Sequence, residues 1–140
     1  MKGKSFSGCV KSVMNTEGAE MLDTNMSGRN ALEMIAEFQF GRLLNFNVKN
    51  IVFHVSLSAS PGEELSNDTW RDFARDYLEG MGFDDNQYIV VKHHKPEDNG
   101  KQNNTHVHII ASRVKLTATM SFKELALHTL IGNMVLKVVT

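Results

Sequence analysis

The chain has 140 residues, of which 41% are hydrophobic and 22% are charged, with a formal net charge of −1 at pH 7. These values are typical of one soluble domain with a hydrophobic core, and they exclude a globally basic nucleic-acid-binding protein but not a local basic groove. A single cysteine, Cys9, excludes an internal disulfide and favours a cytoplasmic location. No apolar run is long enough to span a membrane, and no signal-peptide core follows the basic first residues.

The first fifty residues predict two helices. Val10, Val13 and Met14 have the spacing of a short helix that begins after Ser7-Gly8. Residues 21–29 are rich in Asp, Thr, Asn, Ser and Gly, which favours a connector. Apolar residues recur over 30–40 as in a helix, and Gly41 with the asparagines after it predicts a loop.

Residues 51–58 alternate apolar and polar side chains, which predicts a strand. One face is apolar, whereas the other carries His54, Ser56 and Ser58. We therefore expect a sheet with one face covered and one polar face.

Residues 66–82 are the clearest helix of the chain. Ser66 is a good N-cap, and Gly82 stands where a glycine ends many helices. Between them the apolar side chains follow the helical repeat: Trp70, Phe73, Ala74, Tyr77, Leu78 and Met81. The aromatic stripe of Trp70, Phe73 and Tyr77 predicts core residues rather than a platform for stacking bases.

Two further strands, 88–93 and 105–116, flank a polar loop, and this arrangement predicts a hairpin. After Lys115 the pattern is weaker, with a helix over 121–130 and a strand over 134–139. The whole order predicts an α+β fold, an antiparallel sheet with helices packed on one face.

The hairpin carries the chemistry. His106 and His108 are two residues apart on one strand, so they point to the same face, and His93 ends the strand before the loop. Three imidazoles can then converge on one divalent metal ion and leave open positions on it, as catalysis requires. His94 points to the opposite face and is the weaker candidate, and His54 is either a structural histidine or an accessory residue.

Several stretches, taken in order, resemble the N-terminal catalytic domain of mobilisation and conjugative relaxases, which are HUH (His-hydrophobe-His) endonucleases. They cover most of the chain up to about Val114 and are Gly3–Val10, Phe53–Ser58, Pro61–Glu63, Trp70, Met81–Gly82, Tyr88–His93 and His106–Ile110. An ordered set of this kind is far more specific than one His-x-His pair.

The resemblance implies an antiparallel sheet flanked by helices and a DNA-nicking and rejoining reaction. Relaxases of mobilisable plasmids and transposons bind single-stranded DNA at a transfer origin, in some cases with an accessory mobilisation protein. His93, His106 and His108 would hold Mg²⁺ or Mn²⁺, and a tyrosine near the N-terminus would attack the scissile phosphate to give a 5′-phosphotyrosine.

The sequence departs from the family pattern at the nucleophile. Ser12 stands where relatives with this N-terminal motif have the tyrosine, Lys95 replaces an aspartate, and Ser112 replaces an asparagine. Relaxases usually continue much further, so we expect residues 1–140 to be one truncated relaxase-like domain, with a less regular tail over 115–140.

Three functions therefore remain open: a nicking relaxase, a relaxase remnant that binds metal and single-stranded DNA only, and a structural or metal-storing domain without a DNA partner. Basic residues expected near a DNA path could equally be ordinary surface charges. They are Lys4, Lys11, Arg42, Lys92 and Arg113.

Overall fold

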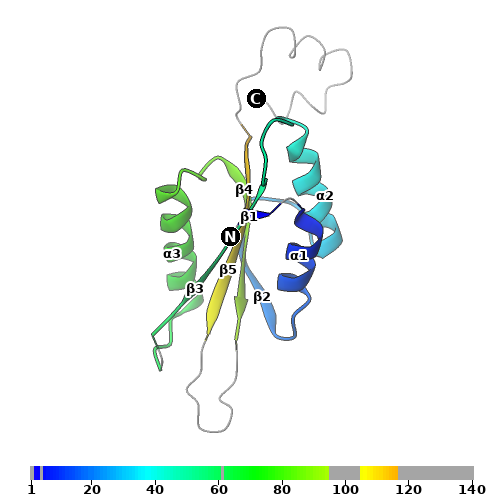
Figure 1. Cartoon of the computed structure of the whole chain (residues 1–140). Helices are drawn as coiled ribbons and strands as arrows, with labels where there is room; N and C mark the ends of the chain where they lie inside the picture. The colour runs from blue at the N-terminus through cyan, green and yellow to red at the C-terminus, as the bar shows by residue number, and fades with distance from the viewer. Residues whose placement is uncertain (1, 4, 61, 95–104, 117–140) are drawn as a thin grey trace.

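The computed structural model describes residues 2–3, 5–60, 62–94 and 105–116. It confirms the α+β class: three helices accompany a five-stranded antiparallel sheet of order β1-β3-β5-β4-β2 (Figure 1). The elements in chain order are β1 (Lys2–Gly3), α1 (Phe6–Met14), β2 (Ala19–Thr24), α2 (Ala31–Arg42), β3 (Val52–Ser58), α3 (Asn67–Gly80), β4 (Asn86–His93) and β5 (His106–Lys115).

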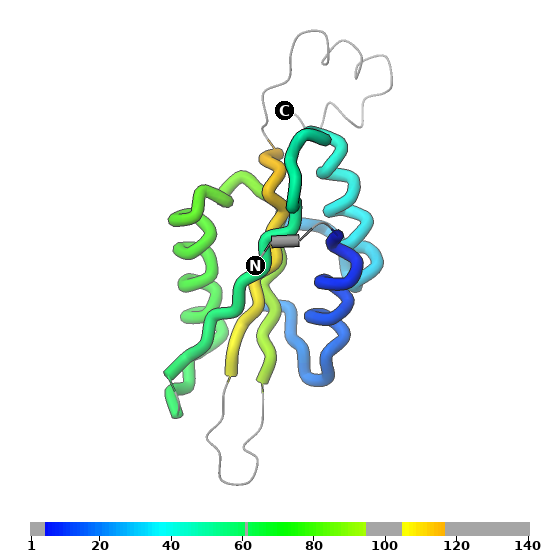
Figure 2. Tube along the Cα trace, in the orientation of Figure 1, coloured from blue at the N-terminus to red at the C-terminus, as the bar shows by residue number. Residues whose placement is uncertain are grey.

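The helices cover both faces of the sheet, which corrects the prediction that they pack on one. In Figures 1 and 2 the sheet stands between α3 on one side and α1 with α2 on the other. The reason is that β4 and β5 are apolar on both faces. Ile89 and Ile110 belong to a core with α1 and α2, whereas Val90 and Ile109 belong to a second core with α3. Because both faces of the central strands are apolar, each face must be buried by helices.

Side-chain caps fix where the helices begin, as the sequence predicted for α3. Ser5, Asn30 and Ser66 each accept a hydrogen bond from a backbone N–H in the first turn of the helix that follows. At the other end of α3, Gly82 has a φ of 79°. The amides of Gly82 and Phe83 donate to the carbonyls of Glu79 and Leu78, the paired bonds of a Schellman motif.

The prediction of a connector over 21–29 is wrong, because Ala19–Thr24 forms the edge strand β2, which pairs with β4. The register shifts between Met21 and Asp23, so the apolar alternation is broken within six residues. Asp23 nevertheless has a structural role, because its carboxylate accepts hydrogen bonds from Arg75 and from the Tyr88 hydroxyl.

Phe73 lies at the margin of α3 rather than in the core as predicted, and Met81 is about equally exposed. Trp70 is 2% exposed, but Phe73 is 50% exposed and Met81 is 48% exposed. Trp70, Ala74 and Leu78 define the buried line of the helix. With a turn of about 100° per residue, Phe73 falls on its flank, and Met81 comes after the last helical residue.

Several sequence predictions lie outside the described residues: the helix over 121–130, the strand over 134–139, most of the hairpin loop, Lys4 and Lys95. None of the described helices is long and apolar enough to cross a membrane.

Candidate metal centre

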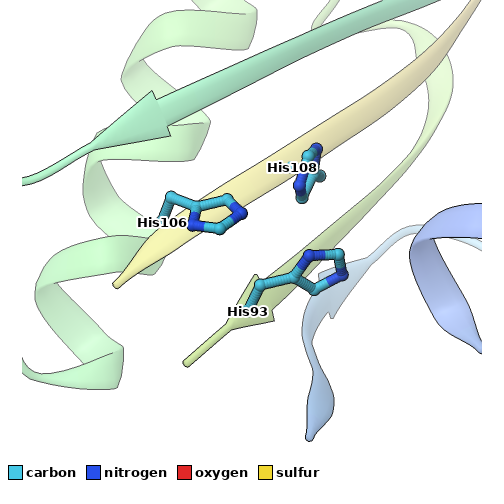
Figure 3. A group of neighbouring side chains, drawn as sticks. All are labelled: His93, His106 and His108. Atoms are coloured by element: carbon cyan, nitrogen blue, oxygen red, sulfur yellow. The ribbon is translucent and has the colours of Figure 1, made fainter. Parts of the chain in front are cut away.

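Strand pairing brings the three histidines together. β4 and β5 are antiparallel, with His93 directly opposite His106 and Val91 opposite His108. All three side chains therefore project from one face of the sheet (Figure 3). Val91 and Ile110, which share this face, belong to the core with α1 and α2. The sequence predicted this convergence from the two-residue spacing and the hairpin.

The trio is compact enough to surround one ion. One ring nitrogen from each of His93, His106 and His108 lies within 4.8 Å of the other two. The ring centroids are 4.4 Å apart for His93 and His108, 4.9 Å for His106 and His108, and 5.3 Å for His93 and His106. Nitrogens bonded to one ion at about 2.1 Å lie closer together than this limit, so small ring rotations would complete the contact.

The end of α1 fixes the orientation of His93. Its Nε2 lies 2.7 Å from the carbonyl oxygen of Val13, in the last turn of the helix. A carbonyl oxygen can only accept a hydrogen bond, so Nε2 carries a proton and neutral His93 has its lone pair on Nδ1. The bond also satisfies one of the carbonyls that a helix C-terminus leaves without an intrahelical partner.

His108 is bonded to a fourth histidine, His54 of β3. Nε2 of His54 lies 2.8 Å from Nδ1 of His108, and the ring centroids are 5.0 Å apart. Burial, followed by the charges of His93, His54 and His106, lowers the pKa of His108 to about 4. Burial also lowers the pKa of His54. Both rings are therefore neutral near pH 7, the form in which a histidine can bind a metal ion.

A known protein family matches most of the chain. The family model of the MobA/VirD2-like relaxases, nuclease domain, matches residues 10–127. The chain belongs to this relaxase family. No curated protein and no solved structure matches the relaxase chain at a significant level.

The donor set of this relaxase fits a divalent metal. Three imidazoles supply three neutral nitrogens, and two of the rings already have a hydrogen-bond partner for the other nitrogen. Three protein ligands leave positions for a phosphate oxygen and water, as in catalytic rather than structural metal sites. His93, His106 and His108 are thus the residues that could hold the metal on which the relaxase family depends.

Two serines of β3, which the sequence did not single out as site residues, lie opposite two of the histidines. Ser58 is directly opposite His106, and Ser56 is directly opposite His108. Directly paired residues share a face, so both hydroxyls border the histidines on the side away from α1, and both residues are exposed. The alternation of 51–58 had placed them on the polar face, and the register shows which histidine each one adjoins.

Neither tyrosine of this relaxase is on the histidine face. Tyr77 and Tyr88 both pack against the core between the sheet and α3, and they are the two tyrosines of the sequence. Ser12 is exposed in the last turn of α1, next to Val13, whose carbonyl meets His93. The position at which the resemblance implies a nucleophile is therefore adjacent in the chain to Val13, which contacts His93 of the trio.

The other predicted residues are dispersed. His94 is exposed and its Nδ1 lies 3.0 Å from the Thr105 hydroxyl, outside the trio. Lys92 lies on the α3 side of the sheet, where its ammonium pairs with Glu20 and donates to Asn67.

The remaining basic residues lie at different distances from the trio. Arg113 donates to the carbonyls of Lys49 and Asn50. It is about 23 Å along β5 from His106, at about 3.3 Å per residue. Arg42 is the last residue of α2, and Lys11 is exposed in α1 beside Ser12.

Acidification is expected to destabilise the fold through His108. Its folded pKa of about 4 lies below the ordinary 6.5, so between these values the unfolded chain binds more protons than the folded one. The free energy of unfolding should therefore fall as the pH drops from 6.5 towards 4. Urea unfolding at a series of pH values measures this, and His108→Gln should show a shallower fall than the wild type. Equal slopes for the two proteins would contradict the assignment.

Proposed function

We propose that this chain is the catalytic palm of a DNA relaxase, which nicks and rejoins one strand of DNA at the transfer origin of a mobilisable plasmid or transposon. The single observation that supports this best is the convergence of His93, His106 and His108 within a chain of the relaxase family. The setting would be the cytoplasm, and an accessory mobilisation protein is a further candidate partner.

The proposed roles follow from position. His93, His106 and His108 would hold the ion, which would polarise the scissile phosphate and offset the charge that develops on its oxygens. Ser56 and Ser58 border the trio with exposed hydroxyls, the groups that commonly bind DNA phosphates. Lys11 lies on α1, the helix that contacts His93. Among the predicted basic residues, it is therefore a better candidate for contact with DNA than Lys92 or Arg113.

Between the two metals implied by the resemblance, the donor set favours Mn²⁺. Imidazole nitrogens suit transition metals, whereas Mg²⁺ prefers oxygen ligands. The trio contributes three nitrogens and no carboxylate. We therefore expect tighter binding of Mn²⁺ than of Mg²⁺ in a calorimetric titration of the protein alone, and the reverse order would contradict the assigned ligands.

A second function is favoured by the placement of the tyrosines. Both pack on the far side of the sheet from the histidines, so neither phenol is placed to attack a phosphate held by the trio. A serine at position 12 has a hydroxyl that is far less acidic than that of tyrosine, with its pKa of about 10. The native chain would then bind metal and single-stranded DNA without cleaving it.

Restoring the phenol tests both functions. Ser12→Tyr is expected to form a covalent adduct with single-stranded DNA in the presence of Mn²⁺. The native chain forms an adduct if it nicks DNA itself and forms none if it is the non-cleaving remnant. In the step, the tyrosine hydroxyl loses its proton and its oxygen bonds to phosphorus, the bond from phosphorus to the 3′ oxygen breaks, and the 3′ oxygen takes up a proton. The probes are labelled single strands that tile the DNA around the gene, and the readout is a shifted band on a denaturing gel.

The controls separate the outcomes. Ser12→Phe supplies the ring without the hydroxyl, and Ser12→Tyr with His108→Ala lacks a ligand, so neither should form the adduct. An adduct with the native chain would overturn the non-cleaving alternative. No adduct with Ser12→Tyr on any strand would contradict the assignment of position 12. If native protein also fails to retain single-stranded DNA at low salt, where phosphate contacts are strongest, the domain has no DNA partner.

A further inference from the structure

His54 is the one histidine of the cluster that is not among the three candidate ligands, and its geometry gives it a different task. Its ring lies on β3, where His54 is opposite Ile110 and diagonal to His108. The 2.8 Å between its Nε2 and Nδ1 of His108 is a hydrogen-bond distance. Two nitrogens bound to one ion at about 2.1 Å would stand farther apart than this in any common coordination geometry. The two nitrogens are therefore hydrogen-bonded to each other rather than arranged as two ligands of one ion.

A hydrogen bond between two imidazoles has two forms, and only one of them allows His108 to bind a metal. If Nδ1 of His108 donates to His54, neutral His108 has its lone pair on Nε2, which then can coordinate. If Nε2 of His54 donates instead, Nδ1 of His108 is the acceptor and Nε2 carries the proton. In the second form neither nitrogen of His108 can reach a metal without breaking the bond.

We propose that His54 is a positioning residue, which accepts the Nδ1 proton of His108 and so presents the Nε2 lone pair of His108 to the metal. This rests on the proposed metal-holding role of the trio. His93 gives an internal parallel, because the carbonyl of Val13 accepts its Nε2 proton and directs Nδ1 inwards. The two ligands are thus oriented from opposite sides, one by a helix end and the other by the neighbouring strand. Partners of this kind fix the ring orientation and tautomer of metal-binding histidines.

The test first removes and then restores the group that accepts the Nδ1 proton of His108. His54→Phe keeps an aromatic ring of similar size but cannot accept a proton, whereas His54→Gln places an amide oxygen at a similar reach. Mn²⁺ affinity of the protein alone is expected to fall by about 10–100-fold in His54→Phe. It should return to within a few-fold of the wild type in His54→Gln. His94→Phe is the matched control, because His94 is an exposed histidine outside the trio, and it should leave the affinity unchanged.

A spectroscopic readout keeps the proposal falsifiable if His54→Phe folds poorly. In wild-type protein loaded with diamagnetic Zn²⁺, the ¹⁵N shifts of His108 should show a protonated Nδ1 and a metal-bound Nε2. Coordination through Nδ1, or equal Mn²⁺ affinity in folded His54→Phe and wild type, would overturn the role of His54 while leaving the trio intact. Wild type that binds neither ion would overturn the metal site itself. The two failures are therefore distinguishable.

Discussion

His108→Ala is expected to abolish Mn²⁺ binding at micromolar metal and, with it, any metal-dependent reaction with DNA. The substitution removes one of three nitrogens that lie within 4.8 Å of one another. Loss of a residue that only hydrogen-bonds to a metal ligand usually lowers metal affinity by about 10–100-fold. Loss of a ligand itself should therefore lower it by more than about 100-fold. A calorimetric titration of Mn²⁺ into each protein gives the affinities.

The matched control for this loss is His94→Ala. His94 is next to His93 in the chain but bonds to Thr105 outside the trio. It should bind Mn²⁺ as the wild type does. Equal affinities for His108→Ala and wild type would show that the ion, if bound, is held elsewhere.

Phe38→Ala is expected to lower the free energy of unfolding by about 3–5 kcal/mol, the usual cost of truncating a buried phenylalanine. Phe38 of α2 is 0% exposed and Phe6 of α1 is 1% exposed. Their rings stack with centroids 4.3 Å apart. The pair joins α1 to α2, and α1 carries both position 12 and the carbonyl that orients His93. Urea unfolding followed by circular dichroism measures the loss.

Phe73→Ala is the control for that substitution, because it makes the same change at a side chain that is 50% exposed. It should change stability by less than about 1 kcal/mol, as is usual for exposed positions. A loss in Phe38→Ala as small as the one expected for Phe73→Ala would mean that the core between α1, α2 and the sheet does not depend on the aromatic pair.

The hairpin and its histidines could be predicted because local sequence patterns determine them. The β-branched residues around His106 and His108 favour a strand, a two-residue spacing places both on one face, and the polar loop sets the turn. His93 then follows from antiparallel pairing. The clustering of the three histidines could thus be predicted from residues that are close together in the sequence.

The prediction that helices cover only one face of the sheet was wrong, because it assumed that every strand alternates apolar and polar side chains as β3 does. In β4, Ile89, Val90 and Val91 are consecutive and all three are buried. A continuous apolar run of this kind indicates a strand covered on both faces, and it was the signal for α3 on the second face. The edge strand β2 was not predicted because its register shift interrupts the apolar alternation within only six residues.

The relation between His54 and His108 could not have come from the sequence. The two residues are 54 positions apart, and their contact depends on the register of β3 against β5. A shift of one residue would turn His54 to the other face, away from His108. Register comes from the packing of whole strands, so it is visible only in the folded structure.

The most direct test of the metal site is a crystal structure of the protein grown with Mn²⁺, with anomalous scattering used to locate the metal. We predict one strong anomalous peak within about 2.0–2.3 Å of a nitrogen from each of His93, His106 and His108, close to the usual metal–imidazole distance. A peak elsewhere, or one that touches fewer than these three rings, would contradict the metal centre and the relaxase chemistry assigned to it.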